Sequence, residues 1–378
     1  MNILIAGDFC QKYRIDKVIK EKHFSKLFDE VKLVTAKADY SIVNFEFPIV
    51  LDPKNASPIP KCGPNLQGTE EAVEAIKYAG FDCCTLANNH ILDQGEVCCI
   101  DTKTELEKAG IDTVGVGSNL KDAAKILYKE INGKTLAIIN CCENEFSIAT
   151  ETSAGSNPLN PIRQYNKIQE ARQHADYLLV IVHGGHELYQ LPSPRMKETY
   201  RFFIDAGADA VVNHHQHCYS GYEIYNGKPI FYGLGNFLFD RTNVMHTSWN
   251  EGYMVNLSFQ EQEIGYTLIP YSQCNEEPTI SLLKDESLNK FNSCIKELSA
   301  IISNDSELGK QHREWMAKSF RHYKLALEPY SGRILSAMYA RNLLPSCITK
   351  KKNLALLNYL ECESHLDRLK FTVKEIFK

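Results

Sequence analysis

The sequence predicts an α/β fold in which two sheets pack together between layers of helices, followed by a helical extension. Up to about residue 215, short apolar runs alternate with segments whose apolar residues recur at helical spacing. After about residue 218, the runs come in pairs joined by turn residues, as antiparallel strands are. From about residue 280 the chain is charged and helical, so we expect a main domain over residues 1–275 and a helical extension over residues 276–378.

The predicted strands of the first half are apolar runs of strand length. They are Ile3–Ala6, Tyr40–Asn44, Cys83–Ala87, Asp112–Val116, Leu136–Cys142, Tyr177–Val182 and Ala210–Asn213. Two segments between them predict helices with clear ends: Thr69–Ala79, which Thr69 would cap and Gly80 would end, and Pro194–Ala206, which Gly207 follows. Strands that alternate with helices in this way form sheets whose faces the helices cover.

The second half predicts two antiparallel pairs of strands. Tyr222–Tyr225 and Pro229–Tyr232 flank Asn226-Gly227, a dipeptide that two-residue hairpin turns favour. Tyr253–Phe259 and Ile264–Tyr271 form the second predicted pair. An alternating half followed by an antiparallel half indicates two packed sheets with helices outside.

The composition indicates an ordinary globular protein. Hydrophobic residues make up 44% and charged residues 24% of the 378 residues, and the formal net charge of -5 argues against nucleic-acid binding. The 13 cysteines show no Cys-x-x-Cys spacing, so we expect buried reduced thiols, which suit the cytoplasm. The apolar run Ile3–Ala6 is far shorter than a signal peptide or a membrane span, so we expect no membrane span and a cytoplasmic location.

Side chains that can bind metals follow five of the predicted strands. They are Asp8, Glu46, the pair Asn89-His90, His183, and the group His214, His215 and His217. Ligands of open α/β sheets bind beyond the carboxyl ends of the strands, which is where all of these residues fall. One histidine at a strand end is commonly structural, but five strand ends that carry such residues predict a metal site.

These residue types suit two divalent cations held about 3.5–4 Å apart, which need a bridging carboxylate with imidazole and oxygen ligands on either side. We predict Glu46 as the bridge, Asp8 and His217 at one metal, and Asn89, His183 and His215 at the other. Mixed nitrogen and oxygen ligands favour manganese, iron or zinc. A centre of this kind turns its bridging water into a hydroxide nucleophile near neutral pH.

Other residues near these strand ends are candidates for catalysis and substrate binding. His90 is the candidate for protonating the leaving group, and Asp93 could either orient His90 or cap a helix. His186 and Glu187 are candidate substrate contacts in a loop that would face the site. Two more candidates are His214 and Asn236, although Asn236 could equally lie in a simple turn.

These segments resemble the CapA family of poly-γ-glutamate capsule biosynthesis proteins, within the calcineurin-like metallophosphoesterase superfamily. The resemblance rests on Gly7-Asp8, Asn44-Phe45-Glu46-Phe47-Pro48-Ile49, Leu86-Ala87-Asn88-Asn89-His90, His183-Gly184-Gly185-His186-Glu187, and the stretch from Phe203 through His214-His215-Gln216-His217 to Phe237. It covers about the first 240–260 residues. It implies a four-layer α-β-β-α metallophosphoesterase-like sandwich and a role in capsule or poly-γ-glutamate biosynthesis.

Three positions depart from the pattern of the superfamily. The His that usually stands two residues after the first Asp is Cys10, the Gly before the His pair is Asn213, and the Trp after the strand-end His is Gly184. The loss of a histidine at Cys10 bears on whether one of the two metal sites is fully occupied. Many members of the family also carry a membrane anchor, which this sequence does not predict.

The sequence leaves three functions open. The chain could be a metal-dependent hydrolase of a phosphoester or of a γ-glutamyl amide, since both reactions use the same hydroxide and Lewis acid. It could instead be a non-hydrolytic, metal-binding accessory protein that works with other capsule-synthesis proteins, or a scaffold with only a partial metal site. The expected substrate is a small molecule or a polymer of phosphoester, γ-glutamyl or glycan-related type.

Overall fold

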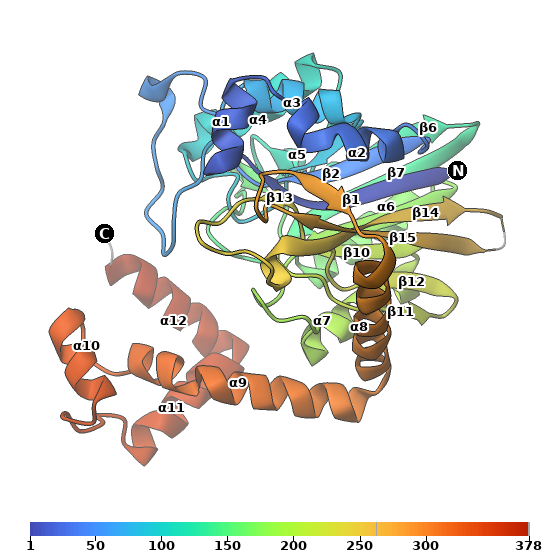
Figure 1. Cartoon of the computed structure of the whole chain (residues 1–378). Helices are drawn as coiled ribbons and strands as arrows, with labels where there is room; N and C mark the ends of the chain where they lie inside the picture. Colours follow the sequence, from blue (N-terminus) through green and yellow to red (C-terminus); the bar gives the residue numbers. More distant parts are fainter. Residues whose placement is uncertain (262, 377–378) are drawn as a thin grey trace. The chain divides into compact units, whose positions relative to one another are not determined.

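The computed structural model describes residues 1–261 and 263–376, in two compact units, Met1–Gly309 and Lys310–Lys378. The first unit holds two large sheets and every predicted strand (Figure 1). The second unit is helical. The prediction of an α/β fold with a helical C-terminal region is therefore confirmed. The boundary after residue 275 stays a prediction.

The first sheet has eight strands, in the order β16-β15-β14-β1-β2-β3-β4, with β13 also paired to β1. Its strands are β1 (Asn2–Cys10), β2 (Tyr40–Phe45), β3 (Cys83–Thr85), β4 (Asp112–Val114), β13 (Asn236–Phe239), β14 (Glu251–Phe259), β15 (Ile264–Gln273) and β16 (Ile280–Leu282). The strands from β1 to β4 run parallel, so their carboxyl ends meet at one edge of the sheet. β14 pairs antiparallel with β1 and with β15, as the predicted second pair requires.

The second sheet has six strands, in the order β11-β12-β10-β9-β7-β6. They are β6 (Leu127–Ile131), β7 (Lys134–Cys142), β9 (Tyr177–His183), β10 (Ala210–His214), β11 (Tyr222–Tyr225) and β12 (Lys228–Phe231). β7, β9, β10 and β12 are parallel neighbours, and β11 and β12 form the predicted hairpin. The predicted strand Asp112–Val116 is interrupted at Gly115, whose φ of 97° ends β4 before β5 (Val116–Gly117), which pairs with β8 (Gly155–Ser156).

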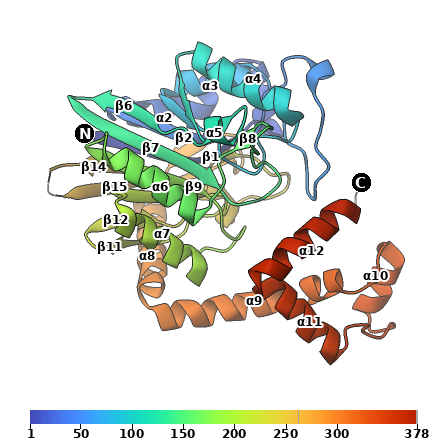
Figure 2. The same cartoon turned by 180° about the vertical axis from the view of Figure 1, so that it is seen from behind.

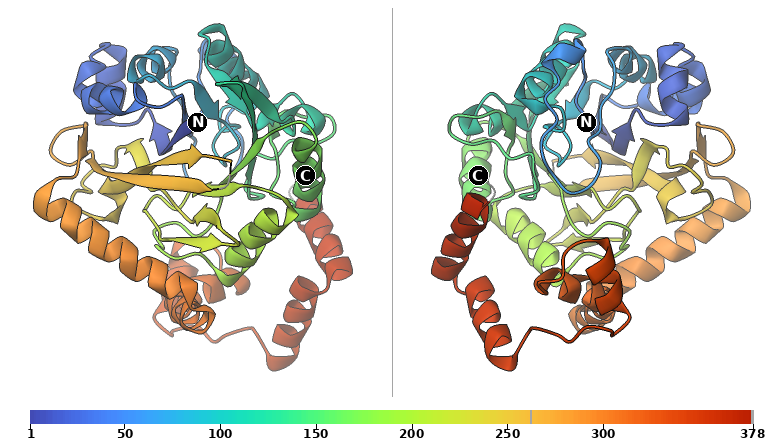
Figure 3. Two further views of the ribbon diagram at one scale, coloured as in Figure 1. Left: turned by 90° about the vertical axis from the view of Figure 1, so that its right-hand side faces the viewer. Right: turned by 90° about the vertical axis from the view of Figure 1, so that its left-hand side faces the viewer.

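Side-chain alternation along β1 explains the layers. Ile3 and Ile5 pack into an apolar cluster with residues of the second sheet, such as Ile138 and Ile181. Leu4, on the other face of β1, packs in a separate cluster with residues of the helices on that side. The first helix layer comprises α1 (Arg14–Lys20), α2 (Ser25–Thr35), α3 (Glu71–Ala79) and α4 (Gly95–Lys108). The second comprises α6 (Pro161–Arg172) and α7 (Pro194–Ala206), which contact β9 and β10 (Figures 2 and 3).

The helix ends follow the sequence signals in all but one case. α7 begins after Ser193, whose hydroxyl accepts a hydrogen bond from the backbone N–H of Met196, and it ends at Gly207 with φ 125°. The prediction that Thr69 caps α3 is wrong, because α3 starts after Glu70. The Thr69 hydroxyl instead accepts a hydrogen bond from Gln11 at 3.0 Å, which ties this segment to β1. The short elements are α5 (Leu120–Ala123) and the 3-10 turns Pro53–Asn55 and Ser248–Asn250.

The C-terminal helices divide between the two units. α8 (Asp285–Ser303) belongs to the first unit, since its Phe291 and Ile295 are buried in the cluster between the sheets. The second unit contains most of α9 (Asp305–Leu327), together with α10 (Arg333–Ala340), α11 (Lys350–Glu361) and α12 (Glu363–Ile376). Inside it, the Glu328 carboxylate accepts hydrogen bonds from Tyr339 and from the backbone of Cys347. None of the helices in the described residues is both long and apolar enough to cross a membrane.

Candidate metal centre

The residues predicted to bind metals converge at the place where the carboxyl ends of both sheets meet. Asp8 lies near the carboxyl end of β1, while Glu46 and Asn89 follow β2 and β3 of the first sheet. His183 ends β9 of the second sheet, and His215 and His217 follow β10. All six side chains are buried, the most exposed being Asn89 and His215 at 6%.

Two groups within this cluster could each hold a metal ion, and they share one carboxylate. Glu46, His183 and His215 form one group, and Asp8, Glu46 and His217 form the other, with the ligand atoms of each group within 4.8 Å of one another. The Asn89 side-chain oxygen lies 3.1 Å from His183 Nε2, on the side of the first group. The shared residue is therefore the one that the sequence predicts as the bridge.

The shared carboxylate has an atom whose surroundings fit a cation. Glu46 Oε1 is buried and lies 3.7 Å from His183 Nε2 and 3.7 Å from His217 Nε2. It has no hydrogen-bond partner among the described residues. A buried carboxylate oxygen without a donor is costly, and a cation between this oxygen and the imidazole nitrogens would satisfy it.

The charges of the cluster are unfavourable without a cation. Burial raises the pKa of Asp8 to about 7, against the opposing hydrogen bonds from Asn44 and the His215 backbone. Burial, with the nearby Asp8 carboxylate, also raises the pKa of Glu46 well above its usual value. Burial lowers the pKa of His183 strongly and that of His217 to about 3, so both rings are neutral near pH 7 and keep a lone pair for a metal.

Asn44 supports the cluster, and the sequence did not single it out as a site residue. Its Nδ2 donates a hydrogen bond to Asp8 Oδ1 at 2.7 Å and lies 3.5 Å from Glu46 Oε2. The same nitrogen is 3.3 Å from His183 Nδ1. The signal for Asn44 was its place two residues before Glu46, at the end of β2, where both side chains point to the same face.

Asn236 holds His217 in place. As the first residue of β13, it faces His217 Nδ1 with its side-chain oxygen at 2.8 Å, and its Nδ2 donates to the His217 and Trp249 carbonyls. This contact leaves His217 Nε2 directed at Glu46. Asn236 is fully buried, so its side chain positions a candidate ligand, whereas the sequence prediction was a substrate contact or a turn.

His90, Asp93 and Lys61 form a second buried polar group beside the candidate ligands. His90 Nδ1 lies 2.6 Å from Asp93 Oδ2, and Lys61 forms an ion pair with the other Asp93 oxygen. Lys61 also lies 3.1 Å from His90 Nδ1, and its side chain is only 2% exposed. The sequence left two roles open for Asp93, orienting His90 or capping a helix. α4 begins after Gln94, so the geometry supports the contact with His90. No sequence pattern pointed to Lys61, which lies in an irregular segment.

The other predicted substrate contacts fall in different places. Glu187 lines an open cavity of about 220 Å³ that also touches His90 and His217. His186 lies next to this position and packs against Tyr189. His214 is 1% exposed at the end of β10. Of these three residues, Glu187 has the position that substrate contact requires.

A second cavity reaches the cluster at His215. Its volume is about 430 Å³, and Glu143, Glu145 and Arg195 contribute to its wall. Glu145 is a further residue that the sequence did not indicate, since its carboxylate accepts a hydrogen bond from Asn89 at 3.0 Å and lies 3.9 Å from His215 Nε2. The cluster is thus accessible from two cavities.

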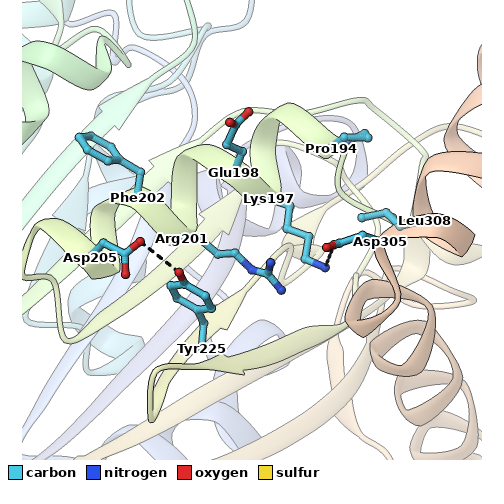
Figure 4. Close-up of a pocket in the computed structure, with 9 residues that line it drawn as sticks. All are labelled: Pro194, Lys197, Glu198, Arg201, Phe202, Asp205, Tyr225, Asp305 and Leu308. Atoms are coloured by element: carbon cyan, nitrogen blue, oxygen red, sulfur yellow. Dashed lines mark hydrogen bonds and ion pairs between the residues drawn. The ribbon is translucent and has the colours of Figure 1, made fainter.

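A cavity of about 400 Å³ between α7 and the start of α9 is not part of this site (Figure 4). Its two cations already have carboxylate partners. Lys197 pairs with Asp305 at 2.6 Å, and Arg201 pairs with Glu223 at 2.6 Å. None of the candidate ligands lines it, and the ion pair between Lys197 and Asp305 joins α7 to the first residues of α9, which belong to the same unit.

Comparison with known proteins identifies the family. Residues 2–241, well over half of the chain, match the family described as "Bacterial capsule synthesis protein PGA_cap". The chain belongs to the PGA_cap family. The matched range contains every candidate ligand and both members of the His90–Asp93 pair.

Two proteins similar to this chain come from Bacillus species. The chain is 33% identical over 247 residues to the capsule biosynthesis protein CapA of Bacillus anthracis, covering 64% of this chain and 60% of that protein. It is 36% identical over 239 residues to the PGA biosynthesis protein CapA of Bacillus subtilis (strain 168), covering 62% of each. The chain therefore matches about three fifths of the length of these two relatives.

Solved structures that align with the chain have low sequence identity to it. A hypothetical protein from Thermus thermophilus aligns with a TM-score of 0.46 and 16% identity, over 72% of this chain and 99% of that one. The 5'-nucleotidase precursor from the same organism aligns with a TM-score of 0.45 and 13% identity, over 79% of this chain and 59% of that one. These similarities concern the fold alone.

Cys10, the position where the resemblance led us to expect a histidine, lies in the apolar core of this PGA_cap chain. It is fully buried and packs in the cluster between the first sheet and its helices. Burial raises the pKa of its thiol well above the usual value, which disfavours the thiolate that binds metals. Cys10 belongs to neither of the two groups that could hold a metal in the described residues.

Proposed function

We propose that this PGA_cap chain is a metal-dependent hydrolase in capsule or poly-γ-glutamate biosynthesis, which cleaves a phosphoester or a γ-glutamyl amide. The observation that carries the proposal is the pair of buried ligand groups that share Glu46. Two divalent cations bound there would supply an activated water and a Lewis acid. The names of the relatives support the setting in capsule synthesis.

The side chains of the cluster have distinct roles in this proposal. Glu46 would offer its one negative charge to both cations, and its fully buried position shields that carboxylate from bulk water. Asp8 and His217 complete one site, held by the hydrogen bonds from Asn44 and to Asn236. His183, His215 and Asn89 complete the other site; Glu145, next to Asn89, orients its amide so that the oxygen faces His183.

His90 is the proposed proton donor to the leaving group. Its Nδ1 faces Asp93, so Nε2 is the nitrogen that can carry a transferable proton. Asp93 stabilises the charged form of the ring, as the carboxylate of a hydrolase triad does. Lys61 binds the second oxygen of Asp93, which holds the carboxylate beside His90.

Metal content is the first test. The purified chain, loaded with manganese or zinc and then desalted, should hold about two ions per chain, and His215→Ala should lower this number. Hydrolysis of an aryl phosphate and of a γ-glutamyl anilide should then be lost in His90→Ala while its metal content is kept. A chain that holds no metal after loading refutes the proposal.

The position of Cys10 favours one alternative, a non-hydrolytic accessory protein. Asp8, Glu46 and His217 supply only three protein ligands at their site, because Cys10 lies in the core. An ion with three protein ligands there would bind less tightly than one with four, and a centre that readily loses one of its two ions cannot sustain two-metal hydrolysis. Retained metal without turnover of either substrate would support this alternative.

A further inference from the structure

We infer that the cavity beside His90 and His217 is an anion-binding subsite, in which Lys12 and Arg241 select substrates that carry a carboxylate or phosphate apart from the reacting bond. Its role as a substrate subsite rests on the proposed function, but anion binding itself does not. The cavity, with a volume of about 220 Å³, has both cations and both histidines in its wall.

Sheet register brings the two cations together. β1 and β13 are parallel neighbours in which Cys10 pairs with Phe239. Lys12 and Arg241 each stand two residues after this pair. The two chain segments therefore leave the sheet side by side and place both charged side chains in the wall of the same cavity. The sequence does not reveal this arrangement, because Lys12 and Arg241 are 229 positions apart.

Among the residues that the structure describes, no carboxylate neutralises either cation. Lys12 Nζ lies 5.0 Å from the centre of the Tyr13 ring, and the Arg241 guanidinium lies 5.0 Å from the centre of the Trp249 ring. No carboxylate oxygen of the described residues lies within 4.0 Å of a charged nitrogen of Lys12 or Arg241, the limit for an ion pair. Cations over aromatic faces keep their donors directed outward, where an oxyanion can accept them.

The acidic residues of the same wall do not cancel this charge. Asp240 is 1% exposed and is held by Arg14, whose Nη2 and Nε donate to its two oxygens at 2.7 and 2.9 Å. Glu187 is exposed and is the one other carboxylate in the wall. Two cations therefore face one carboxylate, and divalent ions in the cluster would add further positive charge.

The aromatic part of the wall connects the subsite to the candidate ligands. The Trp249 ring lies 4.8 Å from the ring of His217 and 5.1 Å from that of Phe239. Trp249 Nε1 donates to the Phe239 carbonyl at 2.7 Å, which fixes the indole as one wall of the cavity. An anion held by Arg241 would thus sit against Trp249, next to a ligand of the reacting centre.

Tryptophan fluorescence tests the inference without requiring metal or turnover. The chain has two tryptophans, so Trp315→Phe leaves Trp249 as the reporter. The metal-free chain is titrated with tri-γ-glutamate, with the same peptide amidated at all of its carboxyl groups, and with phenyl phosphate. Quenching by tri-γ-glutamate assigns the subsite to carboxylates, and quenching by phenyl phosphate assigns it to phosphates.

The matched variants decide whether the named cations are responsible. Lys12→Gln combined with Arg241→Gln should weaken anion binding about tenfold or more. Lys17→Gln combined with Arg163→Gln removes the same charge from exposed positions outside the cavity and should leave the affinity unchanged. Thermal unfolding confirms that both double variants are folded.

Two results would overturn the inference: equal quenching by the charged and the amidated peptide, or unchanged anion affinity in the Lys12 and Arg241 double variant. Metal content is measured on the same preparations. A chain that binds the anion through Lys12 and Arg241 but never holds metal would refute the proposed hydrolase and leave the anion site intact.

Discussion

Replacement of Asp8 by asparagine should stabilise the metal-free protein and at the same time weaken its metal binding. Asp8 is fully buried beside Glu46, and its pKa is raised from 3.8 to about 7. Below pH 3.8 Asp8 is protonated in both the folded and the unfolded state, so its ionisation does not lower the free energy of unfolding. Between pH 3.8 and 7 the unfolded state gives up the proton first, and the folded state loses stability as the pH rises.

The full penalty is present above pH 7. A pKa rise from 3.8 to about 7 corresponds to about 4 kcal/mol, at about 1.4 kcal/mol per pKa unit. Asp8 accepts hydrogen bonds from Asn44 and from the His215 backbone, one on each carboxylate oxygen. An asparagine side chain has only one oxygen, and the loss of one of these hydrogen bonds lowers the free energy of unfolding by about 1 kcal/mol. We therefore expect Asp8→Asn to be about 3 kcal/mol more stable than the natural chain at pH 8 without metal.

The assay is urea unfolding of chelated and desalted protein at pH 5 and pH 8, with and without manganese. The gain from Asp8→Asn should be larger at pH 8 than at pH 5, and manganese should stabilise the natural chain more than the variant. Asp101→Asn, on a partly exposed position of α4, is the control and should change neither quantity. Equal stability of Asp8→Asn and the natural chain at pH 8 without metal would refute the reasoning.

Three further changes test other parts of the site and core. Asn236→Leu removes the oxygen that faces His217 Nδ1, so metal affinity should fall about 10–100-fold in a metal titration while the histidine itself is kept; unchanged affinity would contradict the positioning role. Lys61→Met leaves the buried Asp93 carboxylate without its cation and should lower the free energy of unfolding by about 3 kcal/mol in urea. Phe237→Ala empties a fully buried position that packs on three other aromatic rings. It should lower the free energy of unfolding by about 3–5 kcal/mol, with two-metal stoichiometry retained at low temperature.

The sequence alone determined many elements of the fold and most of the cluster. Strands such as Tyr177–Val182 and helices such as Pro194–Ala206 are encoded in local periodicity and in end signals, which do not depend on distant parts of the chain. The candidate ligands were predictable for a related reason. Each lies at or shortly after the carboxyl end of an apolar strand, and residue chemistry then restricts what such a set can bind.

The supporting residues were beyond the reach of the sequence. Lys61 lies in an irregular segment, and Lys12 and Arg241 are ordinary surface-type residues in any local pattern. β13, which carries Asn236, was not predicted either, because it is four residues long and pairs parallel with β1 from the far end of the main unit. Parallel pairing depends on contacts between distant segments, which local sequence does not encode.

Only the tertiary structure decided that the cluster joins two sheets. Asp8, Glu46 and Asn89 come from the first sheet, while His183, His215 and His217 come from the second. Burial of the apolar faces between the sheets, with Ile3 and Ile5 against Ile138 and Ile181, aligns their carboxyl ends. Local sequence places each ligand at the end of its own strand, but hydrophobic packing of the two sheets sets the distances between the two sets of ligands.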